Sequence, residues 1–239
     1  NSYFLYFFFI IIFLLFNNTH FDYQDSLIFG GADGHSYMSI SKDAPKFTFE
    51  KIMSIHSERF FFPYLIGLVS KILKINLFLT YKASVFLVLA IINIYTIKIF
   101  KSLKLDLNTI LVLLTLINFN PYLTRFYIAV PTIINDLIFI AGILILLQVL
   151  LSRRLLSIPI LIGYIFIFAS RQTSIGLILA YLTTILIKGK KLISVKNEIV
   201  GLIIFILFLI LNFYYSSNTI ENSSSRYELY SPQMRIFGL

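Results

Sequence analysis

The residues best suited to carry chemistry lie in the run Gly30–Tyr37, which reads GGADGHSY. Its glycines permit a tight turn, and Asp33 and Tyr37 are four residues apart, so they would share one face of a following helix. A carboxylate held in this way can take a proton from a hydroxyl group or bind a metal ion. Aspartate is also a common N-terminal cap of a helix, so the spacing alone leaves a catalytic and a capping role open for Asp33.

A second polar group, His56-Ser57-Glu58-Arg59, directly precedes an apolar stretch. It places an imidazole, a carboxylate and a cation within four residues. The planar guanidinium of Arg59 is suited to gripping a phosphate group, which makes His56, Glu58 and Arg59 candidate substrate-binding residues. Basic residues beside apolar helices also anchor such helices to lipid headgroups, and the sequence does not separate the two roles.

Asp136 is an ionisable residue inside an apolar run. It lies seven residues after Ala129, where the run begins, which is about 10 Å along a helix. An ionisable residue at that depth in a membrane is a functional-site hypothesis by default, so Asp136 is the second candidate catalytic residue. Polar side chains near the outer ends of this run and of the preceding run would surround it: Thr132, Asn135, Asn118 and Asn120.

Two further basic residues are expected on the same side of the membrane as these outer ends. Arg125 lies at the tip between two apolar runs, and Arg171 and Gln172 lie between two runs of about sixteen residues each. Runs this short would draw Arg171 below the membrane surface, where it needs a partner. A bound phosphate and a structural ion pair with Asp136 both remain open.

Composition identifies the elements that must position these residues. The chain of 239 residues is 58% hydrophobic and only 13% charged, whereas soluble domains carry about 25% charged residues. An all-α integral membrane protein is therefore expected. The net charge of +9 comes from basic residues that punctuate apolar runs, so nucleic-acid binding is not expected. The chain has no cysteine, which excludes disulfides, thiolate metal sites and a Cys nucleophile.

The apolar runs predict a single membrane domain, 1–239, with about seven spans. Residues 1–16 form a truncated first span, 17–76 a long external loop, 77–215 six spans and 216–239 the start of another external loop. The six spans are expected at 77–100, 105–123, 129–151, 155–169, 172–187 and 199–215. Residues 60–75 carry Gly67, Ser70, Lys71 and Lys74 at helical spacing, the pattern of an amphipathic helix in the membrane interface. Because the chain begins without Met inside an apolar run, a fragment of a longer protein is expected.

The distribution of charge predicts the orientation. With residues 60–75 in the interface, nine basic residues fall in three short loops on one side, which the positive-inside rule makes cytoplasmic. These residues are Lys98, Lys101, Lys104, Arg153, Arg154, Lys188, Lys190, Lys191 and Lys196. All the candidate site residues then lie toward the opposite, external face.

Taken together, these features resemble the GT-C superfamily of polytopic glycosyltransferases, which includes protein O-mannosyltransferases and lipid A aminoarabinose transferases. The resemblance rests on a first span followed by a long external loop with an early acidic motif, here Gly31-Ala-Asp33-Gly-His-Ser-Tyr37. It continues with a membrane-surface helix introduced by Arg59-Phe-Phe-Phe-Pro63 and with the later external Arg171.

The resemblance implies a sugar transfer from a polyprenyl-phosphate donor to a glycan, lipid or protein acceptor. It implies that Asp33 is the general base or a metal ligand, and that Arg59 and Arg171 bind the lipid phosphate. Several family members carry Asp-Glu or Asp-x-Asp where this chain has Asp33-Gly34, so the resemblance does not decide whether a divalent cation is a cofactor.

Three other functions remain open from the sequence. A surface polysaccharide polymerase also uses external arginines on polyprenyl-linked sugars. A transporter or lipid flippase would carry polar groups near the midplane and broken helices. A purely structural subunit gives no account of the acidic external loop. The expected location is a bacterial inner membrane, with the active face periplasmic or extracellular.

Overall fold

The computed structural model describes residues 8–9, 11–12, 34–46, 56, 59–120, 124–152, 158–170 and 195–219. Almost all of these residues are helical and none forms a strand, so the predicted all-α class is confirmed. Residues 34–43 form a helix, as expected after Asp33. The labelled elements are α4 (Phe61–Leu73), α5 (Leu77–Ser102), α6 (Leu107–Asn118), α7 (Phe126–Ala129), the 3-10 turn η2 (Pro131–Ile133), α8 (Ile134–Leu151), α9 (Ile158–Ser170) and α11 (Val195–Thr219).

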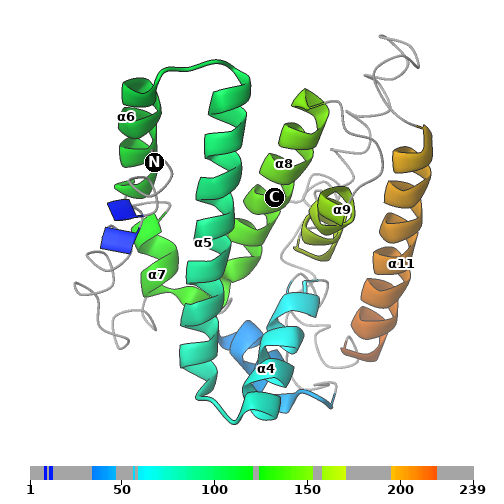
Figure 1. Ribbon diagram of the computed structural model, residues 1–239. Coiled ribbons are helices and arrows are strands. Elements are labelled where there is room, and N and C mark those ends of the chain that lie inside the picture. Colours follow the sequence, from blue (N-terminus) through cyan, green and yellow to red (C-terminus); the bar gives the residue numbers. More distant parts are fainter. Residues whose placement is uncertain are drawn as a thin grey trace, which may run out of the picture.

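The helices pack side by side around α5 and α8 (Figure 1). α8 lies between α5 and α9, α11 covers the other side of α9, and α6 and α7 lie against α5. We call the end of the bundle where α4 lies, at the bottom of Figure 1, the α4 end. The opposite end, where α5 turns into α6, carries Lys98, Lys101 and Lys104, and we call it the lysine end.

Within the part of the chain that the structure describes, two helical stretches, Leu77–Ser102 and Pro131–Leu151, are long and apolar enough to cross a membrane. Four other apolar helices are shorter: Phe61–Leu73, Leu107–Asn118, Ile158–Ser170 and Ile199–Tyr215. The count of seven spans stays a prediction, because the run 172–187 and most of the first run lie outside the described residues. The predicted start of a loop at residue 216 is early by a few residues, since α11 continues to Thr219.

The predicted continuous span over 129–151 is wrong at its start. Val130 leaves the helical region, with φ −119° and ψ 68°, and Pro131 begins a separate 3-10 turn before α8 starts at Ile134. The physical cause is the proline, which cannot donate a backbone hydrogen bond and disfavours helical geometry in the residue before it. Asp136 therefore lies in the first turn of α8 rather than 10 Å inside a helix.

The run 105–123 is also interrupted. α6 ends at Asn118, whose side chain exchanges two hydrogen bonds with that of Asn93 in α5. The two N···O distances are 3.0 and 2.7 Å, and both residues are about 1% exposed. Asn118 was expected in a polar patch with Thr132 and Asn135, but it satisfies its amide in this pair instead. The pair ties α6 to α5, since a buried amide needs partners.

Close backbone approach joins α8 to α9. A Cβ atom placed on Gly142 would lie 2.9 Å from the carbonyl oxygen of Gly163, and one on Gly163 would lie 2.8 Å from the side chain of Leu146. Only glycine at these positions permits this separation of the two helices. The buried apolar core then forms mainly between α5, α8 and α9, with Tyr81, Val85, Leu89, Ile134, Leu137, Ala141 and Ile160 among its least exposed members.

α4 forms as predicted, with Pro63 in its first turn, but the residues of its polar stripe differ in burial. Gly67 and Ser70 are buried, and a Cβ atom on Gly67 would lie 2.1 Å from the carbonyl oxygen of Ser41. The polar stripe predicted for residues 60–75 is therefore divided, because Gly67 and Ser70 are buried and Gly67 packs against helix 34–43. Lys71 and Lys74 remain exposed.

Candidate functional site

Polar side chains from five separate segments meet at the α4 end. We call this group the α4-end cluster; it comprises Tyr37, Ser41, His56, Arg59, Tyr81, Thr132 and Asn135. The members come from helix 34–43, from the residues before α4, from the first turns of α5, and from η2 and the start of α8. Three of the residues predicted from the sequence, Tyr37, His56 and Arg59, belong to it.

The hydroxyl of Ser41 is the centre of the first part of the cluster. Its oxygen lies 2.7 Å from the carbonyl oxygen of Pro63 and 2.5 Å from the hydroxyl of Tyr81. Tyr81 in turn lies within donating distance, 3.2 Å, of the carbonyl oxygen of Tyr37. These bonds connect helix 34–43 to both α4 and α5, and they fix the residues that follow Asp33 against the bundle.

The second part of the cluster contains His56 and Arg59. The His56 ring is buried and meets the Tyr37 ring edge-on, with centroids 5.2 Å apart. The backbone N–H of Arg59 donates to the His56 carbonyl at 3.1 Å. The predicted motifs around residues 33–37 and 56–59 are thus in direct contact, although about twenty residues separate them in the sequence.

The start of α8 completes the cluster. The side-chain amide of Asn135 donates to the Arg59 carbonyl at 3.2 Å, and Thr132 faces Gly34, where a Cβ atom would lie 3.0 Å from the threonine hydroxyl. Asp136 is the next residue in the first turn of α8 and is partly exposed.

Nε of Arg59 and Oδ1 of Asn135 are buried without a hydrogen-bond partner among the described residues. One is a donor and the other an acceptor, and they belong to residues joined by a hydrogen bond. Unsatisfied buried polar atoms are uncommon and call for a specific explanation. A ligand that combines an anionic oxygen with a hydroxyl group would satisfy both.

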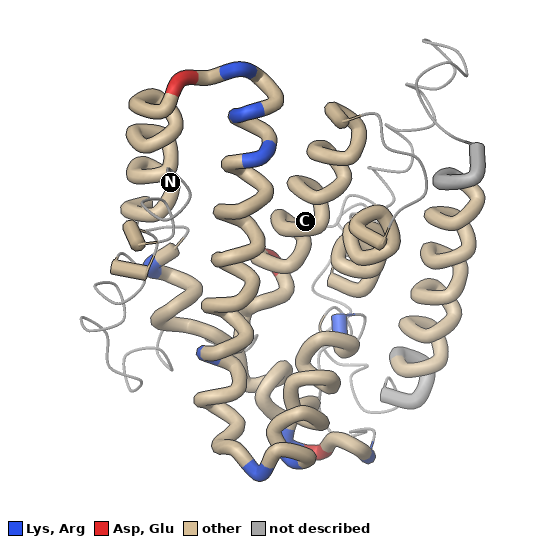
Figure 2. Tube along the Cα trace, viewed as in Figure 1, with Lys and Arg blue, Asp and Glu red and all other residues tan. Residues whose placement is uncertain are grey.

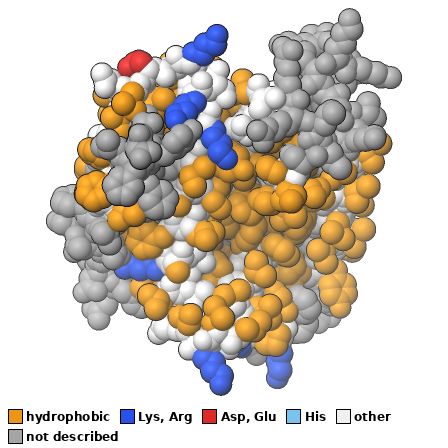
Figure 3. Space-filling view, viewed as in Figure 1, with side chains coloured by type: hydrophobic (Ala, Val, Ile, Leu, Met, Phe, Trp, Pro, Cys, Tyr) orange, Lys and Arg blue, Asp and Glu red, His pale blue; other side chains and the backbone are white. Residues whose placement is uncertain are grey.

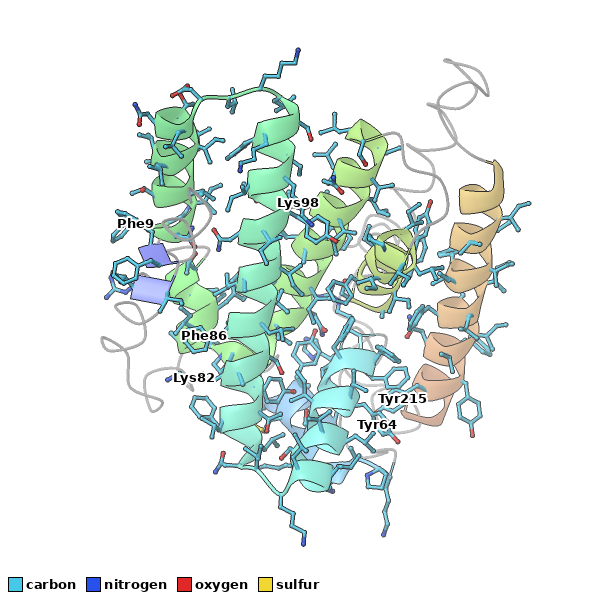
Figure 4. All side chains as sticks on the ribbon, viewed as in Figure 1. Phe9, Tyr64, Lys82, Phe86, Lys98 and Tyr215 are labelled. Carbon is cyan, nitrogen blue, oxygen red and sulfur yellow. The ribbon has the colours of Figure 1, made fainter. Side chains whose placement is uncertain are left out.

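Aromatic side chains close the cluster on the side of α11. The rings of Phe60 and Tyr215 stack with centroids 4.1 Å apart and planes 5° apart. Tyr64 packs beside them and donates to the Pro45 carbonyl at 2.9 Å. Tyr64 and Tyr215 lie near each other at the lower end of the molecule, whereas Lys98 lies in its upper half (Figure 4).

Arg125 is not brought to the cluster. The Thr124 hydroxyl donates to the Ile117 carbonyl at 3.3 Å, and the next residue, Asn118, pairs with Asn93. Asn93 is sixteen residues, about 24 Å, from the start of α5 at the α4 end. The exposed Arg125 therefore directly precedes α7, well inside the length of the bundle.

Four of the predicted site residues, Asp33, Glu58, Arg171 and Gln172, lie outside the described residues. The described residues contain no group of three or more His, Asp or Glu side chains that could hold a metal ion. Sequence reasoning missed Ser41 and Tyr81. No local pattern links two residues forty positions apart, and the one signal was a tyrosine in the first turn or two of an apolar run.

No protein-family model matches this sequence, and no significant similarity links it to a curated protein or to a solved structure.

Proposed function

We propose that this protein is an integral membrane glycosyltransferase that moves a sugar from a polyprenyl-phosphate carrier to an acceptor on the non-cytoplasmic side. The observation that carries the proposal is the convergence of two sequence motifs at the α4 end. The segment that follows Asp33 contacts the segment that ends in Arg59, and both contact the start of α8. A donor phosphate and an acceptor hydroxyl must meet in one place, and this convergence provides such a place.

The surface supports a membrane location for this chemistry. Hydrophobic side chains form a broad band across the middle of the face seen in Figure 3, and most Lys and Arg lie above and below it. The tube view gives the same division, with basic residues at the α5–α6 turn and beneath α4 (Figure 2). By the positive-inside rule we assign the lysine end to the cytoplasm, so the α4-end cluster would face the other side.

In the proposed reaction, the Asp33 carboxylate takes the proton of the acceptor hydroxyl as its oxygen attacks the anomeric carbon of the donor sugar. The bond between that carbon and the phosphate oxygen breaks, and the electron pair leaves with the polyprenyl phosphate. Arg59 stabilises the negative charge that grows on this leaving group, because fixed positive charge lowers the energy of the transition state. Among the described residues, Nε of Arg59 is a buried donor without a hydrogen-bond partner, so it is available for this role. Arg171 is proposed to assist it.

The test is transfer of a labelled sugar from a polyprenyl-phosphate donor in membranes that contain the full chain. We expect Asp33→Asn to abolish transfer and Arg59→Lys to reduce it about 100-fold, since a lysine cannot reproduce the planar two-point contact. The matched control is Lys46→Gln, which removes an exposed cation at the same end of the bundle. Full transfer by Asp33→Asn at equal protein levels would refute the assignment.

A second candidate is a transporter or lipid flippase, and one observation favours it. The chain between α6 and α8 is broken at Asn118 and again at Val130, and irregular backbone at membrane depth is tolerated where it is buried or lines a cavity. Movement of a lipid between leaflets of reconstituted vesicles, without any sugar transfer and unaffected by Asp33→Asn, would favour this function over the glycosyltransferase.

A further inference from the structure

The turn from α4 to α5 exposes an unusual combination of side chains. Residues 71–76, which we call the α4–α5 tip, expose Ile72 by 69%, Leu73 by 58% and Ile75 by 41%. Lys71 and Lys74 are exposed among them, and the tip has no acidic residue. Large apolar side chains beside cations are the composition of a surface that meets both acyl chains and anionic headgroups.

The tip has a fixed backbone. Lys74 adopts a left-handed conformation with φ 54°, and the Ile75 N–H donates to the Ser70 carbonyl at 3.0 Å. The Ser70 hydroxyl donates to the Ile75 carbonyl at 2.7 Å, and the Asn76 side chain caps α5 by accepting from the N–H of Phe78 at 2.9 Å. These hydrogen bonds hold the turn in one conformation, and that conformation leaves the apolar side chains exposed.

Packing of α4 determines which residues remain outside. Its small residues Gly67 and Ser70 face the protein, and Gly67 approaches the Ser41 carbonyl too closely for any side chain. This contact holds α4 against helix 34–43 and directs its last turn, with Ile72 and Leu73, away from the core. The segment thus presents its apolar residues at the tip rather than along a whole face.

The depth of the tip follows from α5. Twenty residues separate Lys98 from Phe78, which is about 30 Å of helix and matches the thickness of a bilayer's hydrocarbon core. Apart from Lys82, whose ammonium lies 5.8 Å from the centre of the Phe78 ring, no charged residue interrupts this stretch. With Lys98 at one boundary of the hydrocarbon, the tip begins at the other.

We propose that the α4–α5 tip is a binding surface for anionic phospholipids of the non-cytoplasmic leaflet. Ile72, Leu73 and Ile75 insert at the level where the acyl chains begin, and Lys71 and Lys74 contact the headgroup phosphates. Charge complementarity favours lipid as the occupant, because two cations flank the apolar residues and no acid is available to pair with them within the tip. The surface would hold the start of α4, and with it the α4-end cluster, at a constant distance from the membrane.

The composition of the chain permits a direct test, because the sequence contains no tryptophan. Ile72→Trp introduces a single fluorophore at the tip, and the full chain is reconstituted in vesicles whose acyl chains carry bromine, a quencher, at defined depths. We expect strong quenching by bromine near the glycerol end of the chains and little by bromine near the bilayer centre. Leu87→Trp, exposed at mid-helix on α5, verifies insertion through quenching by deep bromine, and Lys46→Trp reports a water-exposed position.

The headgroup preference is tested in the Ile72→Trp background. Adding phosphatidylglycerol to phosphatidylcholine vesicles should increase the quenching at least twofold, and Lys71→Glu with Lys74→Glu should remove that increase. Lys101→Glu with Lys104→Glu makes the same change in charge at the lysine end and should leave it intact. A tip tryptophan quenched no more than Lys46→Trp, while Leu87→Trp is quenched normally, would overturn the proposal. Quenching independent of phosphatidylglycerol would overturn the anionic preference.

Discussion

The contact between Gly67 and Ser41 allows a quantitative prediction for Gly67→Ala. The added Cβ would lie 2.1 Å from the Ser41 carbonyl oxygen and 2.7 Å from the carbonyl carbon. To reach the 3.4 Å of an ordinary contact, α4 and helix 34–43 must separate by about 1.3 Å. Neither side of the contact can yield locally, because both are backbone.

The separation affects more than the methyl group. Overpacking of this size costs about 2 kcal/mol. The Ser41 hydroxyl lies 2.7 Å from the Pro63 carbonyl oxygen, so the same movement breaks that bond and strains the one to Tyr81, at about 1 kcal/mol each. Alanine is better than glycine in a helix by about 1 kcal/mol. The net prediction is a loss of about 3 kcal/mol in the free energy of unfolding.

Gly201→Ala is the matched control. It is also a glycine inside a helix, but its added Cβ would meet ring atoms of Tyr164, the nearest 2.7 Å away. An aromatic side chain can tilt where a carbonyl group cannot move, and the gain in helix propensity is the same. We expect Gly201→Ala to change the free energy of unfolding by about 1 kcal/mol or less.

The assay is equilibrium unfolding of both variants in mixed detergent micelles, followed by circular dichroism. The reasoning would be refuted if Gly67→Ala were as stable as Gly201→Ala. A second readout addresses the cluster, because a shift of helix 34–43 displaces Tyr37 from His56. If the proposed sugar transfer is observed, Gly67→Ala should reduce its rate at temperatures where the protein remains folded.

Three other predictions follow from single contacts. Asn93→Leu and Asn118→Leu should each destabilise the fold, but a double-mutant cycle should show a coupling of about 1 kcal/mol, whereas full additivity would contradict a shared amide pair. Hydrogen bonds from the first turn of α6 hold the pKa of Asp106 below its usual value, and the hydroxyl of Thr109 makes the largest contribution to this shift. The contribution of Asp106 to stability is therefore present above about pH 4 and is lost as the pH falls through the lower folded-state pKa. Asp106→Ala should therefore destabilise the protein at pH 7 and progressively less as the pH falls below the unfolded-state pKa, and a loss that does not change with pH would contradict this cap. Gly142→Val should cost about 3 kcal/mol or more because it meets the backbone of α9, while Ala83→Val on an exposed face should cost little, a contrast measurable in one denaturation series.

Sequence reasoning predicted the helices well and their ends less well. The long apolar runs around α5 and α8 are helices, and Pro63 lies in the first turn of α4, because a proline is tolerated there. Pro131 interrupts the helix before α8, but it lies inside an apolar run, and the apolar run by itself predicts one continuous span. As a result, Asp136 was expected deep in a span, although it lies in a first turn.

The partners of polar residues were the part that sequence could not supply. Helical spacing grouped Gly67, Ser70, Lys71 and Lys74 on one stripe, but it could not reveal that helix 34–43 would pack against Gly67 while the lysines stay exposed. Asn118 found its partner in α5, twenty-five residues earlier, rather than in the nearer polar residues. Such pairings depend on how helices pack in three dimensions, and spacing along one helix contains no information about them.

The Asn93–Asn118 pair has a consequence for how the chain enters a membrane during synthesis. α6 is apolar but has only 12 residues, about 18 Å of helix, and ends in a buried amide, so it lacks the length to span the hydrocarbon core by itself. Its partner α5 has 26 residues and leaves the ribosome first. We therefore expect α6 to remain outside the lipid until the side chain of Asn118 can pair with that of Asn93, so that α5 and α6 insert together as one helical hairpin.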